Sequence, residues 1–165
     1  MSEIRRSPAR AVLVAALAAL SVAVIGGTLT DTGAWYQALA KPAWTPPDPA
    51  FGAIWTIIFA LAAMSGAIAW RATEHRSARE WTIGLFSLNG FLNVLWSLLF
   101  FRLQRPDLAL LEVVPFWFSI GLLMAIIWPA SRAASLLLAP YLVWVTLAGL
   151  LNYQVVHLNG PFGAP

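Results

Sequence analysis

The sequence predicts an all-α integral membrane protein, a single bundle of five transmembrane helices with a structured first loop. The first observation is the composition, because 60% of the 165 residues are hydrophobic and only 10% are charged. The mean hydropathy is correspondingly high, at +0.75. The second is that several apolar runs approach the roughly 20 residues that cross a bilayer. The third is the segment WYQALAKPAWTPP at residues 35–47, between the first two runs. A soluble globular domain does not have this composition.

Polar or proline-containing stretches divide the chain into five apolar runs, and each run is expected to be a membrane-spanning helix. The runs cover about residues 11–29, 51–70, 81–101, 108–128 and 133–156, so that the bundle extends over residues 11–156. A polar N-terminal segment, residues 1–10, precedes the bundle, and a C-terminal tail, residues 157–165, follows it. Residues 71–80 are the most polar stretch of the chain and are predicted to form a loop.

The first run also resembles a secretory signal peptide, with residues 21–23 (Ser-Val-Ala) as a cleavage region. It is, however, long for the apolar region of a signal peptide, and its removal would leave only four helices. A first membrane span is the preferred interpretation, and the signal peptide is the alternative.

The segment at residues 35–47, called the strap below, separates the first two spans. Its prolines fix their own φ and exclude the preceding residues from the α region, so the strap is predicted to be stiff and non-helical. Trp35, Tyr36 and Trp44 combine flat rings with one polar atom each, which suits the border between apolar core and water. The strap is therefore either an interfacial anchor or a lid over a ligand site, since long ordered loops are usually functional.

The positive charges predict the orientation of the chain. Of the ten Lys and Arg residues, seven fall on the side of the N-terminus: Arg5, Arg6, Arg10, Arg71, Arg76, Arg79 and Arg132. The other side holds Lys41, Arg102 and Arg105. This bias places the N-terminus in the cytoplasm, with the strap and the C-terminus outside. Helical spans indicate a multi-pass protein of a bacterial inner membrane. The net charge of +3 comes from loop ends, so it does not indicate a nucleic-acid partner.

Conventional catalytic and metal-binding patterns have no support in the sequence. There is no cysteine, and the two histidines, His75 and His157, lie far apart without a carboxylate cluster. We therefore expect no metal site and no bound cofactor. No catalytic triad, paired-carboxylate motif or glycine-rich nucleotide loop is present. Glu112, about one turn inside the fourth span, is predicted to be an interfacial carboxylate near a helix N-terminus.

Polar, small and aromatic side chains repeat at helical spacing in four of the spans and are expected to face the bundle interior. The stripes are Trp55, Phe59, Ala62, Gly66 and Trp70; Asn89, Asn93, Trp96 and Ser97; Trp117, Gly121, Met124 and Trp128; and Tyr141, Trp144, Ala148, Asn152 and Asn159. Of the tryptophans, Trp70, Trp81 and Trp128 lie near span ends and are expected to be residues of the interfacial aromatic belt. Helix–helix packing explains the small residues and some of the amides. Interior tryptophans are harder to explain by packing alone, and a pocket of aromatic faces with a few amides would suit a flat, largely apolar ligand.

Several of these residues also match a known family in order along the chain. The matching motifs are WYxxLxKPxWxPP at residues 35–47, Trp55-Thr56, Asn93-x-x-Trp96-Ser97-x-x-Phe100-Phe101, Pro140-Tyr141-x-x-Trp144, Leu151-Asn152 and Leu158-Asn159. This pattern resembles the tryptophan-rich sensory protein (TspO/MBR) family, which includes the translocator protein or peripheral-type benzodiazepine receptor. The strap motif is the most specific part, and the first span adds nothing to the resemblance.

The resemblance implies a homodimeric five-helix receptor-like protein whose first loop closes over a pocket for porphyrins and similar flat hydrophobic ligands. The expected ligand-binding residues are Trp35, Tyr36, Trp44, Pro47, Trp55, Phe59, Asn89, Asn93, Trp96, Trp117, Trp144, Ala148 and Asn152. Relatives reported to degrade protoporphyrin in light imply an alternative function, in which Trp55 and Trp144 would be the catalytic residues. A tetrapyrrole transporter or exporter is a further alternative.

Two departures from the family pattern affect these expectations. Many relatives have tyrosine at the position of Phe59, so the pocket lacks that hydroxyl here. The weak sterol-binding pattern requires a basic residue shortly after tyrosine, but Tyr153 is followed by His157. We therefore expect no strong preference for sterols.

Overall fold

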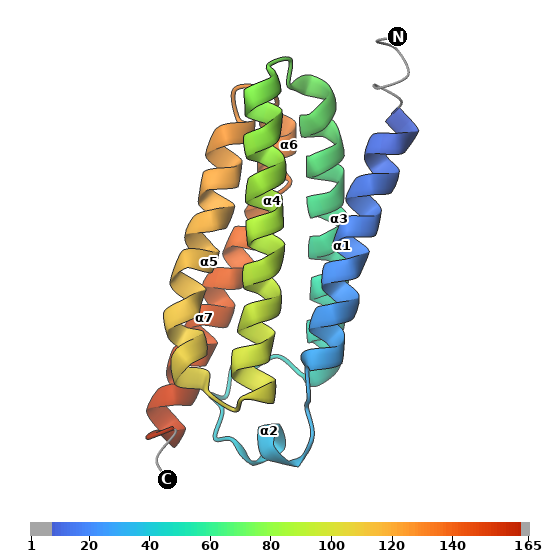
Figure 1. Ribbon diagram of the computed structural model, residues 1–165. Helices are drawn as coiled ribbons and strands as arrows, with labels where there is room; N and C mark the ends of the chain where they lie inside the picture. The colour runs from blue at the N-terminus through green and yellow to red at the C-terminus, as the bar shows by residue number, and fades with distance from the viewer. Residues whose placement is uncertain (1–7, 163–165) are drawn as a thin grey trace.

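The computed structural model describes residues 8–162 and is an all-helical bundle (Figure 1). The long helices are α1 (Pro8–Leu29), α3 (Asp48–Ala72), α4 (Arg76–Ser97), α5 (Pro106–Ile127) and α7 (Ala139–Asn159). Short segments are α2 (Ala34–Ala38), the π-helical turn η2 (Leu98–Arg102) and α6 (Arg132–Leu136). Five helical segments are long and apolar enough to cross a membrane, which confirms the predicted fold class. The expectations for residues 1–7, including Arg5 and Arg6, and for residues 163–165 lie outside the described part.

The long helices run up and down, so that the polar connections gather at two opposite ends (Figure 1). The α3–α4 loop and the start of α1 lie at one end, whereas α2, the strap and the C-terminal end of α7 lie at the other. Helix α1 packs against α3 and α4 and is the least buried of the five. Helix α5 packs between α4 and α7, which leaves space beside α1 in the half of the bundle that the strap covers.

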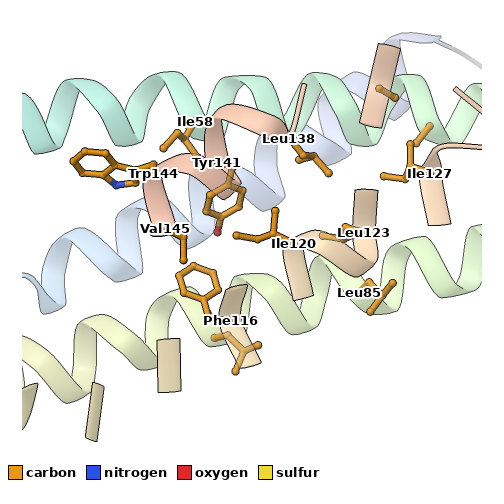
Figure 2. Packing of buried hydrophobic residues seen from close by; sticks show 13 residues of the cluster. Ile58, Leu85, Phe116, Ile120, Leu123, Ile127, Leu138, Tyr141, Trp144 and Val145 are labelled. Carbon is orange, nitrogen blue, oxygen red and sulfur yellow. The ribbon is translucent and has the colours of Figure 1, made fainter. Parts of the chain in front are cut away.

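The main hydrophobic core joins α3, α4, α5, α6 and α7. Ile58, Ile120, Leu123 and Val145 are almost fully buried there, and Phe116 lies near Tyr141 in the same cluster (Figure 2). A second cluster joins the strap to the bundle through Tyr36, Leu39, Phe100, Ala109 and Val155. Large apolar residues are also exposed on the outer faces, for example Leu111 and Phe118 on α5. Such residues suit contact with lipid.

Two stretches predicted to be loops are partly helical. Helix α4 already begins at Arg76, and only residues 73–75 separate it from α3. An i,i+4 ion pair of 2.7 Å between Arg76 and Glu80 supports this first turn. The strap is also not entirely non-helical, because α2 includes its first residues. The first strap proline is Pro42, and the restriction that proline imposes on its neighbour does not extend back to α2.

The last apolar run is divided into α6 and α7, with Pro140 in the first turn of α7. Because proline has no N–H and suits the first turn of a helix, the chain begins a new helix there instead of kinking a continuous one. Helix α7 continues to Asn159, beyond the expected end of the span. Ser65 of α3 donates a 2.7 Å hydrogen bond to the Ala134 carbonyl and so connects α6 to α3.

The predicted inward stripe of the fourth span is wrong. Trp117 is exposed, and the buried face of α5 instead carries Phe116, Ile120 and Leu123. Helix α5 is apolar on nearly all sides, so hydrophobic periodicity gives little indication of which face turns inward.

Candidate functional site

A cavity of about 650 Å³ lies in the strap half of the bundle. Helices α1, α3, α4, α5 and α7 supply its walls, and Tyr36 and Lys41 of the strap line the end that faces water. The expected ligand-binding residues that line it are Tyr36, Trp55, Phe59, Asn93, Trp96, Trp144, Ala148 and Asn152. Its volume is within the range of small-molecule sites, and its wall is mainly apolar, as in most such sites.

Aromatic rings from α3 and α7 form one wall of the cavity. Trp55 stacks on Phe59 with ring centroids 5.4 Å apart and an angle of 26° between the planes. The rings of Trp55 and Tyr141 form a T-shaped pair with centroids 5.9 Å apart. The rings of Phe51 and Trp144 form a second T-shaped pair, with centroids 5.6 Å apart. Positions 51, 55 and 59 follow the i,i+4 spacing of one helix face, which explains why these α3 rings turn toward the same space. The wall therefore offers flat apolar surfaces to a ligand.

A second aromatic group lies beneath the strap. The ring of Trp96 stacks on that of Phe100, with centroids 4.9 Å apart. The ring of Tyr36 in the strap packs against that of Phe101, with centroids 5.6 Å apart. Phe100 and Phe101 are neighbours in sequence, yet both line the cavity, and they lie in the π-helical turn η2. A π turn adds a residue to the helical turn, and such turns occur frequently at functional sites. Here the turn supports both the cavity and the strap.

Helix α1 supplies the opposite wall with small side chains. Ala19, Ala23, Gly26 and Thr30 line the cavity, and they follow the spacing of one helix face. A Cβ atom on Gly26 would lie 3.7 Å from Asn93 Oδ1, so this part of α1 faces the amide stripe of α4 across a narrow gap. None of the α1 residues was assigned to the site from the sequence, although their spacing is the signal that would have found them.

A polar network crosses the bundle at the inner end of the cavity. The Tyr141 hydroxyl donates to Asn89 Oδ1 at 3.0 Å, and Asn89 Nδ2 donates to Ser119 Oγ at 2.8 Å. Asn93 Nδ2 makes a longer contact of 3.5 Å with the Tyr141 oxygen. Within residues 8–162, no group donates a hydrogen bond to Asn93 Oδ1. This oxygen can therefore accept one from a ligand.

Asn152 lines the cavity, but its side chain also fastens α7 to α5. With its amide oriented so that donors meet acceptors, its nitrogen donates to the Pro106 carbonyl at 3.0 Å, and its oxygen accepts from the Leu110 N–H at 3.0 Å. Both of its polar atoms then bind the first turn of α5. Asn152 is consequently a structural residue at the edge of the site as well as part of its wall.

Three buried polar groups have no hydrogen-bond partner among the described residues: the indole N–H groups of Trp96 and Trp144 and the carboxyl group of Glu112. Glu112 is only 7% exposed, so it is not the interfacial carboxylate that the sequence predicts. It lies on the inward face of α5, between the cavity-lining residues Val113 and Phe116 and the buried Ala109. Burial of an unpaired carboxyl group in a membrane span is costly, and ionisable residues inside such spans usually belong to functional sites.

Polar groups of the strap surround the outer end of the cavity. Lys41 Nζ donates to the carbonyls of Tyr36, at 2.6 Å, and Leu39, at 3.3 Å, and lies 4.3 Å from the centre of the Tyr36 ring. Gln37 donates to Asp48 at 2.8 Å and so joins α2 to the start of α3. Burial, and then the negative charge of Asp48, raise the pKa of the Tyr36 phenol. Tyr36 is therefore a neutral hydroxyl at the cavity entrance.

The other expected ligand-binding residues do not line the cavity. Trp35 packs beside it, with its ring 6.0 Å from Phe100. Trp44 is 51% exposed, and Pro47 is the exposed N-cap residue of α3. Asn89 is buried in the polar network. Trp117 lies on the outer side, where its indole donates to Thr146 at 2.8 Å. Among residues 8–162, no three His, Asp or Glu side chains gather in a way that could hold a metal ion.

Comparison with known proteins gives consistent matches that cover most of the chain. The model of the TspO/MBR family matches residues 12–158. "Tryptophan-rich protein TspO" of Chlorobaculum tepidum is 39% identical over 144 residues, which cover 85% of this chain and 90% of that protein. "Protein CrtK" of Rhodobacter capsulatus is 34% identical over 136 residues, or 81% and 83% of the two chains. The "Translocator protein" of Bos taurus is 30% identical over 127 residues, or 76% and 75%.

Proposed function

This chain belongs to the TspO/MBR family, and on that premise we propose that it is a membrane receptor-like protein for tetrapyrroles and similar flat hydrophobic molecules. The observation that carries the proposal is the aromatic cavity under the strap, bounded by Trp55, Phe59, Trp96 and Trp144. Flat apolar surfaces bind a planar conjugated ring by offset stacking and by burial of apolar area. Protoporphyrin and haem-type molecules are planar rings of this kind.

The few polar groups of the cavity support the same ligand class. Asn93 Oδ1 faces the cavity opposite Gly26, and Lys41 and Asp48 lie at its outer end. An apolar ring can therefore lie among the aromatic residues while its polar edge reaches the strap. Such a division, with a mainly apolar wall and a small number of orienting polar groups, is typical of small-molecule sites.

The experiment that tests binding is a titration with protoporphyrin IX in the dark. The purified protein is placed in lipid nanodiscs, and quenching of tryptophan fluorescence is followed together with the porphyrin absorption spectrum. We expect saturable binding of one porphyrin per chain. Empty nanodiscs measure porphyrin that partitions into lipid, and a signal that rises without saturation, as in those discs, would contradict the proposal.

Light-dependent degradation of porphyrin is a second candidate, because Trp55 and Trp144 line the same cavity. Indole rings next to a photo-excited porphyrin can exchange electrons with it, and dissolved dioxygen would be the oxidant that takes up the electrons lost by the porphyrin. A binding protein alone leaves the porphyrin spectrum intact. Illumination of the saturated complex separates the two functions. Loss of the porphyrin band with formation of a defined product supports an enzyme, and an unchanged band supports binding alone.

A further inference from the structure

The strap is hydrogen-bonded to one side chain at the end of α7. The Asn159 amide forms a two-point pair with the backbone of Ala40: Oδ1 accepts from the Ala40 N–H at 2.8 Å, and Nδ2 donates to the Ala40 carbonyl at 2.9 Å. In the described part of the chain, these are the only hydrogen bonds from residues 35–47 to α4, η2, α5 or α7. The two residues are 119 positions apart in sequence. The pair therefore joins the strap directly to the far end of the bundle.

The Asn159 side chain is also held by its own helix. Its Nδ2 also donates to the Val155 carbonyl one turn earlier at 2.8 Å, which fixes the side chain against its own helix. Only asparagine and glutamine carry an amide donor and an amide acceptor together, and asparagine has the shorter arm. Apolar side chains make neither contact, and aspartate, when ionised, makes only the first.

The pair acts on the part of the strap that covers the cavity. Ala40 is followed by Lys41, which lines the cavity and holds the carbonyls of Tyr36 and Leu39. After Lys41, the strap makes only local hydrogen bonds, such as the one from Thr45 to the Pro42 carbonyl, and Trp44 is exposed. Release of Ala40 would therefore free this segment, whereas Tyr36 and Leu39 would still hold α2 in the second core cluster.

We propose that Asn159 is a positioning residue that latches the strap over the cavity and sets how fast a ligand leaves. The inference rests on the proposed ligand-binding function of the cavity, but opening of the strap can be measured without any ligand. Both hydrogen bonds of the pair are exposed, and breaking two bonds at the lower end of the usual net stabilisation increases the open fraction about tenfold. Because a ligand that enters or leaves past the strap needs the open state, a larger open fraction increases both the release rate and the association rate.

The first test measures opening in the absence of ligand. Because the chain has no cysteine, Ser97→Cys places a single thiol in the cavity wall with little change in volume. Its reaction rate with a small, charged methanethiosulfonate reagent is measured in phosphatidylcholine nanodiscs. A charged reagent does not enter through lipid, so the rate reports strap opening. Adding Asn159→Leu, which keeps the approximate size of the side chain and removes both bonds, is expected to raise the rate about tenfold.

The matched control is His157→Ala in the same Ser97→Cys protein. His157 is exposed at the same end of α7 and stacks on Tyr153. The control is expected to react at the parent rate. Equal rates for Asn159→Leu and the parent overturn the latch, and so does an equally large increase in the control, because it would indicate general loosening of the helix end. A thermal melt of each variant confirms that the compared proteins are folded.

The second test uses protoporphyrin IX and the chain with its natural Ser97. Stopped-flow measurements on Asn159→Leu are expected to show about tenfold faster release and a comparable increase in the association rate, because entry and exit past the strap both need the open state. If no variant binds the porphyrin but thiol labelling accelerates, the proposed ligand is wrong and the latch stands. If all variants bind with equal release rates and labelling is unchanged, the latch is wrong and the binding function stands.

Discussion

The Tyr141 hydroxyl donates a 3.0 Å hydrogen bond to Asn89 Oδ1 and joins α7 to α4 in the middle of the bundle. Asn89 also donates to Ser119 on α5, so one amide connects three helices. Asn93, one turn further along α4, makes only a 3.5 Å contact with the same hydroxyl and turns its oxygen toward the cavity. The two amides share a helix face but have different surroundings, and we expect their replacement to have different effects.

Asn93→Leu is expected to weaken protoporphyrin binding by about 1–2 kcal/mol, the usual contribution of a hydrogen bond inside a membrane protein. Asn89→Leu should instead lower the melting temperature, because it leaves the Tyr141 hydroxyl and Ser119 without their partner. Fluorescence titration and a circular-dichroism melt of both variants give the comparison. Equal affinities of Asn93→Leu and the parent would assign Asn93 to helix packing.

Gly26→Phe is expected to exclude the ligand while the bundle remains folded. The nearest side-chain atoms to a Cβ at this position are 3.7 and 3.9 Å away, so a side chain can begin there without a clash and extend into the cavity. We expect at least a tenfold loss of porphyrin affinity. Gly84→Phe is the matched control, because Gly84 is exposed on α4 and has nothing within 4 Å of its Cβ position. Unchanged affinity of Gly26→Phe would show that the α1 wall is not part of the site, and equal losses in both variants would assign the loss to a general effect of the added ring.

The amide and tryptophan positions of α4 and α7 could be predicted because a polar group in a hydrocarbon environment has few favourable places. Asn89, Asn93, Tyr141 and Trp144 are buried, as their spacing indicates, whereas Tyr153 turns outward. On α5 the same reasoning fails. Phe116 is buried and Phe118 is exposed, and residues of the same type cannot reveal which of them faces lipid.

Features that depend on contacts between distant segments could not be predicted. The π turn brings Phe100 and Phe101 under Tyr36 and Trp35, and this packing is not encoded in local propensity. Asn159 belongs to a recognisable motif, but its partner is a backbone group 119 positions away. The α1 wall of the cavity was missed because small residues also indicate ordinary helix packing.

Replacing Trp144 or Trp55 by Phe separates binding from light-dependent chemistry. Phenylalanine keeps a flat apolar ring, so dark affinity is expected to fall by no more than about threefold. If the indoles take part in porphyrin oxidation, each variant should lose most of the light-dependent bleaching, because phenylalanine is much harder to oxidise. Absorbance is followed under controlled illumination, with Trp81→Phe as control, since Trp81 is 66% exposed on α4. Bleaching at parent rates in both cavity variants would assign the photochemistry to the free porphyrin.

The charge bias predicts that the α3–α4 loop lies in the cytoplasm and the strap outside. Figure 1 places these segments at opposite ends of the bundle, so one labelling experiment decides both. Single cysteines at Ser77 and Thr45 are tested on intact cells with a membrane-impermeant thiol reagent. We expect the cysteine at position 45 to react and the one at position 77 to react only after the cells are opened. The opposite pattern would reverse the orientation.

Replacing Pro42, Pro46 and Pro47 together by glycine tests whether the strap is a lid. Proline reduces the conformational freedom that the closed strap loses, and Pro47 already has a φ of −62° at the start of α3. The triple variant is therefore expected to release porphyrin about tenfold faster, with a smaller effect on association. Its melting temperature without ligand should fall only slightly, because Tyr36 and Leu39 still anchor the strap. Pro129→Gly adds flexibility at the other end of the bundle and should leave the release rate unchanged. A purely interfacial anchor gives the reverse pattern, a large loss of stability with unaltered ligand kinetics, and stopped-flow binding measured beside a melt distinguishes the two.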